Sequence, residues 1–200
     1  MSAVRYDGLP FDGFPFIAST SDGPAVLADL SPLIAATTQW LTRSYPACGG
    51  ALAAALGEVQ ARQAVTVAAW LRYPTPTDAA LVRMAGPGGS AGLDWITGAD
   101  ATPQDEADDF AWRTWVDEVV ASWAACLLTD EELARLAVAA LADGAHSTGA
   151  PIAFRRLVSP DTHDRQAAAL LRHPDLLAPV AALHRTALHE RLDPGQALIA

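Results

Sequence analysis

The sequence contains neither lysine nor asparagine, so all 13 of its basic residues are arginine. Both missing amino acids have codons that begin with AA, and their absence is typical of a GC-rich genome of the actinobacterial kind. The chain also has 23 acidic residues, so the formal net charge of its 200 residues is −10. Proteins that bind the phosphate backbone of nucleic acid need a concentrated basic face. Nucleic acid is therefore not an expected partner.

Cysteine is scarce as well. The chain has only Cys48 and Cys126, and neither belongs to a CxxC pair. This excludes a disulfide framework and a cysteine-based zinc site, and it fits a reduced, cytoplasmic compartment. ExxH pairs, which are typical of helical di-metal proteins, are also missing; Asp143 and His146 have that spacing but lie on either side of Gly144. We therefore expect no metal site and no cofactor, and a metal-dependent enzyme is only the third hypothesis.

Long apolar runs are absent too. Uncharged stretches such as Ser44 to Gly57 contain proline, cysteine and glycine, and they fall short of the about 20 apolar residues that a membrane span needs. The N-terminus has no apolar signal region. Half of the residues are nevertheless hydrophobic, which is enough for one domain with its own core. The sequence predicts a soluble single domain without a membrane partner.

The first 29 residues contain a small tandem repeat, in which YDGLPF at 6–11 overlaps FDGFPF at 11–16. Each copy places an Asp-Gly turn before a proline, with aromatic residues on either side. We interpret residues 1–29 as an irregular arm packed on the body, burying Phe11, Phe14 and Phe16. The arm either simply covers apolar surface, which is the simpler interpretation, or acts as a lid.

Residues 30–200 are predicted to form an all-α, single-domain bundle of six or seven helices. Alanine and leucine are abundant, and no sustained alternation of β-branched residues indicates a strand. Proline, glycine and capping residues, among them a capping box from Thr129 to Glu132, divide the region. The predicted helical stretches are 31–45, 46–73, 77–86, 103–128, 129–142, 150–158 and 161–192, the last kinked or broken at Pro174 and, as a further candidate, at Pro179.

Four carboxylates stand directly before the first tryptophan of the stretch predicted over 103–128, in DEADDFAW at 105–112. At 100° per residue, three of these acids continue the apolar stripe of that helix, while Asp117 and Glu118 fall on the opposite face. The residues on the stripe include Asp105, Asp108, Asp109, Trp112, Trp115 and Trp123.

The three aspartates of the stripe allow two interpretations. In the first, they form a solvated helix start that interacts favourably with the macrodipole. In the second, they lie at the mouth of a cavity lined by tryptophan. Clustered carboxylates repel each other, so one could keep its proton near neutral pH and act as a general acid beside an anionic neighbour.

DEADD also resembles the aspartate-rich DDxxD-type signature of class I terpene synthases, with Asp105, Glu106 and Asp109 in the acidic positions. EADD, at 106–109, is similar to the DxDD acid motif of class II cyclases. The resemblance covers five residues and implies cyclisation chemistry. Because the chain has no asparagine, the second metal-binding motif of the class I enzymes is missing in its usual form.

Polar residues interrupt other apolar stripes. Gln63 and Thr66 lie on the buried side of the stretch over 46–73, where they either bond within the core or line a ligand cavity. His184 lies on the buried stripe of the last helix, as a hydrogen-bonded core residue or as a proton-transfer group. Cys48, near a helix start, either packs inertly or acts as a nucleophile.

These patterns predict a small helical-bundle enzyme of specialised metabolism that carries out acid/base cyclisation or isomerisation of a mostly apolar substrate, without a cofactor. The candidate catalytic residues are Asp105, Asp108, Asp109 and His184. The candidate substrate-binding residues are Gln63, Thr66, Trp70, Tyr73, Trp112, Trp115 and Trp123. The alternative is a non-catalytic domain that sequesters an apolar or cationic small molecule or docks a protein, and a homodimer is one candidate for the assembly.

Overall fold

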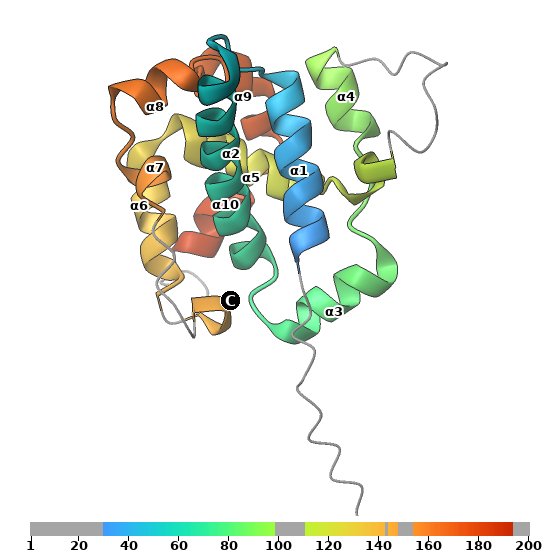
Figure 1. Ribbon diagram of the computed structural model, residues 1–200. Helices are drawn as coiled ribbons and strands as arrows, with labels where there is room; N and C mark the ends of the chain where they lie inside the picture. Colours follow the sequence, from blue (N-terminus) through green and yellow to red (C-terminus); the bar gives the residue numbers. More distant parts are fainter. Residues whose placement is uncertain (1–29, 99–110, 143, 148–153, 194–200) are drawn as a thin grey trace, which may run out of the picture.

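The computed structural model describes residues 30–98, 111–142, 144–147 and 154–193 (Figure 1). Within these ranges the chain is all-α and contains no strand, which confirms the predicted fold class. The predicted aromatic arm at 1–29 and the acidic segment at 105–109 lie outside the described residues.

The described residues form more and shorter helices than the six or seven that the sequence predicts. In chain order they are α1 (Ser31–Ser44), α2 (Gly50–Arg72), α3 (Pro76–Ala85), α4 (Ala91–Thr97), the 3-10 helix η1 (Ala111–Trp115), α5 (Glu118–Thr129), α6 (Glu131–Ala140), the 3-10 helix η2 (Ala145–Ser147), α7 (Arg155–Val158), α8 (Thr162–Ala167), α9 (Pro174–Ala182) and α10 (Arg185–Leu192). Helix α2 matches the stretch predicted over 46–73, whereas the stretches predicted over 103–128 and 161–192 are both divided.

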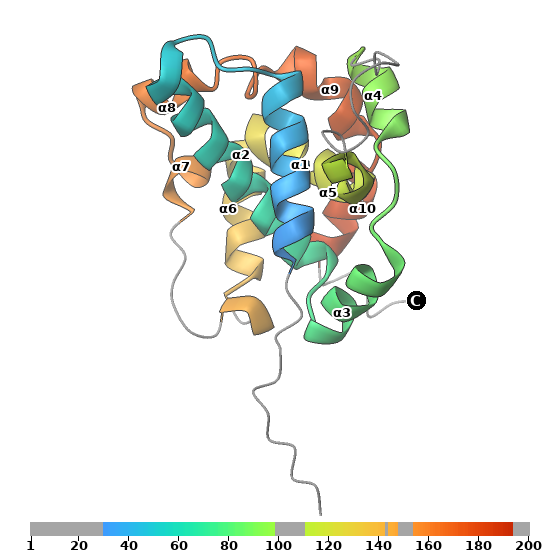
Figure 2. The ribbon, with the colours of Figure 1, turned by 45° about the vertical axis from the view of Figure 1, so that its right-hand side comes forward.

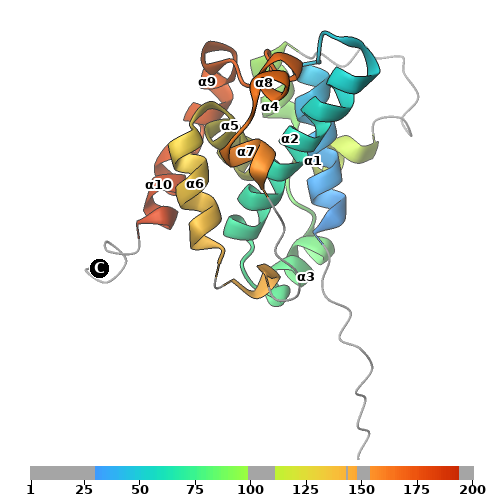
Figure 3. The same ribbon diagram turned by 60° about the vertical axis from the view of Figure 1, so that its left-hand side comes forward.

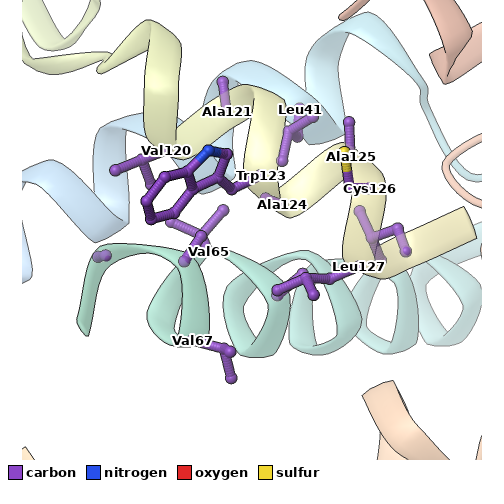
Figure 4. Packing of buried hydrophobic residues seen from close by; sticks show 14 of the residues in the cluster. Leu41, Val65, Val67, Val120, Ala121, Trp123, Ala124, Ala125, Cys126 and Leu127 are labelled. Atoms are coloured by element: carbon purple, nitrogen blue, oxygen red, sulfur yellow. The ribbon is translucent and has the colours of Figure 1, made fainter. Parts of the chain in front are cut away.

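Helix α5 lies in the centre of the bundle. Its residues 120–128 are all buried. A helix that is buried on every side needs neighbours all round, and α5 packs against α1, α2, α6, α9 and α10. Figure 4 shows Trp123 and Leu127 of α5 pointing toward α2, beside Val65. Helices α1 and α2 run side by side in Figure 1, with α6, α7 and α8 on one flank and α3 and α4 on the other.

The prediction of one continuous helix over 103–128 is wrong. Helix η1 ends at Trp115 and α5 begins at Glu118. Between them Asp117 has an extended backbone, and its Oδ1 accepts a hydrogen bond of 2.9 Å from the N–H of Val120. Aspartate stabilises a helix start in this way, so it favours a new helix over continuation of the old one. The 100° spacing therefore cannot be projected from the acids at 105–109 across this break.

The predicted capping box of Thr129 is also wrong. Thr129 is the last residue of α5, and its hydroxyl donates back to the carbonyl of Ala125 at 2.9 Å. The N-cap of α6 is Asp130, whose Oδ1 accepts from the N–H groups of Glu132 and Leu133, each at 3.0 Å. A carboxylate is a strong N-cap, and here it follows the threonine directly. The new helix therefore begins one residue later than predicted.

Arg172, which follows α8, joins three helices. Its Nε donates to Oε1 of Gln60 on α2 at 2.5 Å, its Nη1 to the carbonyl of Leu128 at 3.2 Å, and its Nη2 to the carbonyl of Arg156 at 2.7 Å. The two carbonyls belong to the last turn of α5 and to the short helix α7, where backbone acceptors lack helical partners. Burial lowers the pKa of the guanidinium. Arg172 therefore caps two helix ends and holds both against α2.

Candidate functional site

A histidine and a glutamate meet where α10 and α5 begin. Nε2 of His184 lies 2.8 Å from Oε1 of Glu118. The side chains are 32% and 41% exposed, so solvent reaches both groups. Helices α5 and α10 pack against each other, and α4, α5 and α10 come together on the side shown at the right of Figure 2. His184 is one of the candidate catalytic residues, whereas the helical projection places Glu118 on a purely solvated face.

The backbone of His184 is fixed by two buried side chains of α5. Its N–H donates to Oγ of Ser122 at 3.0 Å, and its carbonyl accepts from Nε1 of Trp123 at 3.1 Å. The Ser122 hydroxyl in turn donates to the carbonyl of Ala181 at 3.2 Å. These bonds anchor the turn between α9 and α10 on the central helix. They also bring Trp123, one of the candidate binding residues, next to His184.

The pair has the arrangement of an oriented base. When His184 is neutral, Nε2 can donate its hydrogen to the Glu118 carboxylate; when it is protonated, the two form an ion pair. Nδ1 has no partner among the described residues. An imidazole that is held at one nitrogen and has no hydrogen-bond partner at the other can act as a general base.

Helix α4 approaches the pair through a glycine. A Cβ built on Gly92 would lie 3.2 Å from Oε2 of Glu118, a distance shorter than ordinary side-chain packing. Glycine at this position therefore lets the backbone of α4 lie close to the carboxylate. The same helix carries Trp95, whose side chain is largely exposed. The site is thus bordered by α4 as well as by α5 and α10.

A second carboxylate next to the pair has a structural role. Asp117 is 3% exposed, and its Oδ2 accepts a hydrogen bond of 2.5 Å from the Tyr73 hydroxyl. Burial, and then the bond to Asp117 and its charge, raise the pKa of Tyr73 well above its usual range. The phenol therefore stays neutral and donates. Tyr73, a candidate binding residue, links the end of α2 to the start of α5.

A third carboxylate, Asp94, ties α4 to α1 and η1. Its Oδ1 accepts from Nε1 of Trp40 at 2.9 Å, and its Oδ2 lies 3.4 Å from Nη1 of Arg113. The candidate residue Trp112 lies beside this group, with the guanidinium of Arg43 5.0 Å and that of Arg113 5.6 Å from the centre of its ring. Cation–π contacts of this kind stabilise an indole ring at a helix junction.

The remaining candidate binding residues lie in other parts of the bundle. Oε1 of Gln63 accepts from the N–H of Leu157 at 3.0 Å, and the Thr66 hydroxyl donates to the carbonyl of Arg62 at 2.7 Å. Trp115 is half-buried and packs on the core. Trp70 stacks on His146 at the far end of α2. The tryptophans therefore do not share one set of contacts, and Asp105, Asp108 and Asp109 lie outside the described residues.

Neither Glu118 nor Ser122 was predicted from the sequence to be a site residue. The sequence does carry one local signal for Glu118. Asp117 is a residue type that favours the N-cap position, and an N-cap at Asp117 starts a new helix at Glu118. The pairing with His184, 66 positions away, has no such local signal.

Among the described residues, no group of three or more histidine, cysteine, aspartate or glutamate side chains could hold a metal ion. The described helices also include none that is both long and apolar enough to span a membrane. Comparisons of the chain with protein-family models, with curated proteins and with solved structures found no match.

Proposed function

We propose that the protein is a small helical-bundle enzyme that transfers a proton within a mostly apolar organic substrate, as in an isomerisation or a cyclisation. His184 acts as the general base, and Glu118 orients it. One observation carries the proposal: Nε2 of His184 lies 2.8 Å from Oε1 of Glu118, while Nδ1 has no partner among the described residues. This is how a carboxylate prepares an imidazole for proton transfer.

In the proposed step, Nδ1 of His184 removes a proton from a carbon next to a carbonyl group of the substrate. The electron pair of the broken C–H bond moves into the new carbon–carbon double bond, and the carbonyl oxygen takes up the negative charge. The imidazolium that forms is stabilised by the Glu118 carboxylate 2.8 Å away. If the substrate carries a C=C bond beside the deprotonated carbon, the product is a dienolate. Protonation of its far carbon then shifts the double bond and restores the carbonyl group, which completes an isomerisation without an oxidant or a reductant.

The fixed backbone of His184 supports this role. A base is effective only when it is held in its productive geometry by groups that are themselves rigid. Ser122 and Trp123 provide such support, since both are buried in α5 and each makes one hydrogen bond to the His184 backbone. The acids Asp105, Asp108 and Asp109 remain candidates for the group that returns the proton, and the step at His184 does not depend on them.

Hydrogen–deuterium exchange tests the proposal with a range of compounds in place of one chosen substrate. The protein is incubated in D2O with a collection of small carbonyl compounds, and exchange of carbon-bound hydrogen is followed by mass spectrometry. We expect at least one compound to gain deuterium, and His184→Gln to slow this exchange by about 100-fold or more. Glu118→Gln should slow it less, because the base is retained. His189→Gln, which alters an exposed histidine on the same helix, is the matched control.

Two results would overturn the proposal. One is exchange that is equally fast in His184→Gln, and the other is a complete lack of exchange by the unaltered protein. Asp108→Asn then tests the proposed proton donor separately: if Asp108 returns the proton, isomerisation should slow while exchange at the first carbon continues.

Non-catalytic binding of an apolar or cationic small molecule is the second candidate function. It is favoured by a cleft of about 260 Å3 between α1, α2 and α8, which is lined mainly by small apolar residues and by a single acid, Glu58. Gly57 lies in its wall, and a Cβ there would have ordinary contacts at 3.7 and 3.8 Å. For a binder, Gly57→Leu should displace a co-purifying ligand, whereas His184→Gln should leave that ligand bound.

A further inference from the structure

A second cleft lies at the C-terminal end of α2, and none of its lining residues belongs to the pair of His184 and Glu118. Its volume is about 200 Å3, and its walls come from the end of α2, the end of α6, η2 and α10. Figure 3 shows α6 and α10 next to each other, and both helices are in contact within the bundle. The lining residues that matter for its chemistry are Trp70, Pro74, Leu141, His146 and Arg191.

We propose that this cleft binds a small planar molecule that carries a carboxylate, such as a single aromatic ring with an acid substituent. The inference goes beyond the proposed function, because the cleft shares no residue with the pair of His184 and Glu118. It stands on two features: a wall of fixed aromatic rings and an arginine whose end groups are left without a partner among the described residues.

The aromatic wall is held in place by its own contacts. The rings of Trp70 and His146 are stacked, with centroids 5.4 Å apart and planes inclined by 14°. Phe154 meets Trp70 edge-on at 5.9 Å. Nε2 of His146 lies 2.7 Å from the carbonyl oxygen of Tyr73, which fixes the imidazole on the end of α2. A flat ring in the cleft can therefore stack or pack edge-on against planar groups that do not need to rearrange.

Arg191 provides the charge. Its Nε donates to the carbonyl of Leu71 at 3.1 Å, which orients the guanidinium at the rim of the cleft. Its two Nη groups have no partner within the described part of the chain. A guanidinium that is fixed through Nε and open at both Nη atoms presents two parallel donors, the geometry that a carboxylate accepts.

The acid whose charge interacts with Arg191 already has hydrogen-bond partners of its own. Asp78 lies close enough for the charges of Arg191 and His146 to contribute to the lowering of its pKa. Its Oδ2, however, accepts hydrogen bonds from the backbone N–H and from the hydroxyl of Thr75, at 3.0 and 2.6 Å. These bonds cap α3 and keep the carboxylate at that helix start. Arg191 therefore remains available to an external anion.

The size of the cleft limits the ligand to about one ring. A cavity of about 150 Å3 is large enough to hold benzene. The 200 Å3 here therefore accommodate one ring and a short acidic substituent, and not a fused polycyclic skeleton. Pro74 and Leu141 complete the apolar walls against which the ring would lie.

The test uses the full chain with benzoate as the probe, followed by isothermal titration calorimetry and by the shift in melting temperature. We expect benzoate to bind at a single site in the millimolar range or tighter. Benzamide has the ring without the charge and acetate has the charge without the ring, so both should bind at least ten-fold more weakly. Arg191→Gln should weaken benzoate binding by ten-fold or more, whereas Arg185→Gln, an exposed arginine on the same helix, should not.

Arg191 is exposed, so Arg191→Gln should fold, and an unchanged melting temperature without benzoate verifies this. The proposal is overturned if benzoate binds Arg191→Gln as tightly as the unaltered protein, or if the unaltered protein binds benzoate no better than acetate. Glu118→Gln separates the two sites, because it should leave benzoate affinity unchanged whatever its effect on proton transfer.

Discussion

The Tyr73 hydroxyl donates a hydrogen bond of 2.5 Å to Oδ2 of Asp117, and Oδ1 of the same carboxylate accepts from the N–H of Val120 at 2.9 Å. One buried aspartate therefore both starts the central helix α5 and holds the end of α2. Buried carboxylates are costly unless their oxygens are paired, and here each oxygen has a partner.

Replacing Tyr73 by phenylalanine should lower the free energy of unfolding by about 1–3 kcal/mol, because the buried Asp117 carboxylate loses one of its two partners. Urea denaturation followed by circular dichroism measures the change. Tyr45→Phe is the control: that hydroxyl makes a single 3.3 Å bond to the carbonyl of Leu176, and its loss should cost less. Equal costs for the two variants would contradict the role given to Asp117.

Tyr73 also predicts how stability depends on alkaline pH. Burial and the bond to Asp117 raise the pKa of Tyr73 in the folded protein above the value of about 10 in the unfolded chain. A raised folded pKa stabilises the fold fully below about pH 10, and this contribution is lost as pH rises further. Above pH 10, urea midpoints should therefore fall more steeply for the unaltered protein than for Tyr73→Phe. Parallel curves would mean that the phenol is not held as described.

Arg172→Leu should destabilise the protein by about 3 kcal/mol or more. The change removes hydrogen bonds to the carbonyls of Leu128 and Arg156 and leaves the buried Oε1 of Gln60 without its donor. Arg135 offers a matched control, since it forms an exposed ion pair with Glu132. Arg135→Leu should change the free energy of unfolding by at most about 0.5–1 kcal/mol. Thermal or urea unfolding of both variants measures the two changes in the free energy of unfolding.

Ser122→Ala should release the turn that carries His184. The hydroxyl is fully buried and bonds both to the N–H of His184 and to the carbonyl of Ala181, so its removal should cost about 1–3 kcal/mol. Amide hydrogen exchange should accelerate at His184 more than in the middle of α2. Uniform acceleration along the chain would indicate general loss of stability instead of a local effect.

The two cysteines should differ in reactivity. Cys48 is exposed, whereas Cys126 is fully buried and burial raises the pKa of its thiol. A thiol reagent added to the native protein should therefore modify Cys48 rapidly and Cys126 only after unfolding. Cys48→Ser should abolish the rapid phase, and Cys126→Ser should leave it intact.

Features fixed by local sequence were predicted well. The all-α class follows from composition, and α2 follows from a long stretch without an internal proline, so that its ends differ from the predicted ones by only a few residues. Pro174 does begin a new helix, α9, while Pro179 lies inside it. These outcomes depend on backbone preferences that act within a few residues.

The error over 103–128 has a different origin. Apolar residues continue at helical spacing through 116–119, so periodicity alone favours one helix. Asp117 interrupts it because Tyr73, 44 positions away, and the N–H of Val120 together satisfy its carboxylate in an extended conformation. The bond to Val120 is local and typical of an N-cap, whereas the bond to Tyr73 depends on tertiary structure and is not visible in a local pattern.

The candidate site was predicted in part for the same reason. His184 was singled out because it interrupts an apolar stripe, a local feature. Its partner Glu118 was assigned to the opposite face by a projection that assumed an unbroken helix. Gln63 and Thr66 were expected on the buried side of their helix, but both are only partly buried. Gln63 accepts from the N–H of Leu157, and Thr66 donates to the carbonyl of Arg62 within the same helix.

Alanine occupies positions 121, 124 and 125 of α5, and all three residues are fully buried among the surrounding helices. Extra methylene groups would have no room there, since close-packed interiors resist even small increases in volume. The periphery is less constrained, because residues such as Arg191 and Glu118 stand at helix ends and their side chains reach solvent. Exchange of exposed side chains at the helix ends therefore offers evolution a route to new ligands that leaves the packing around α5 unchanged.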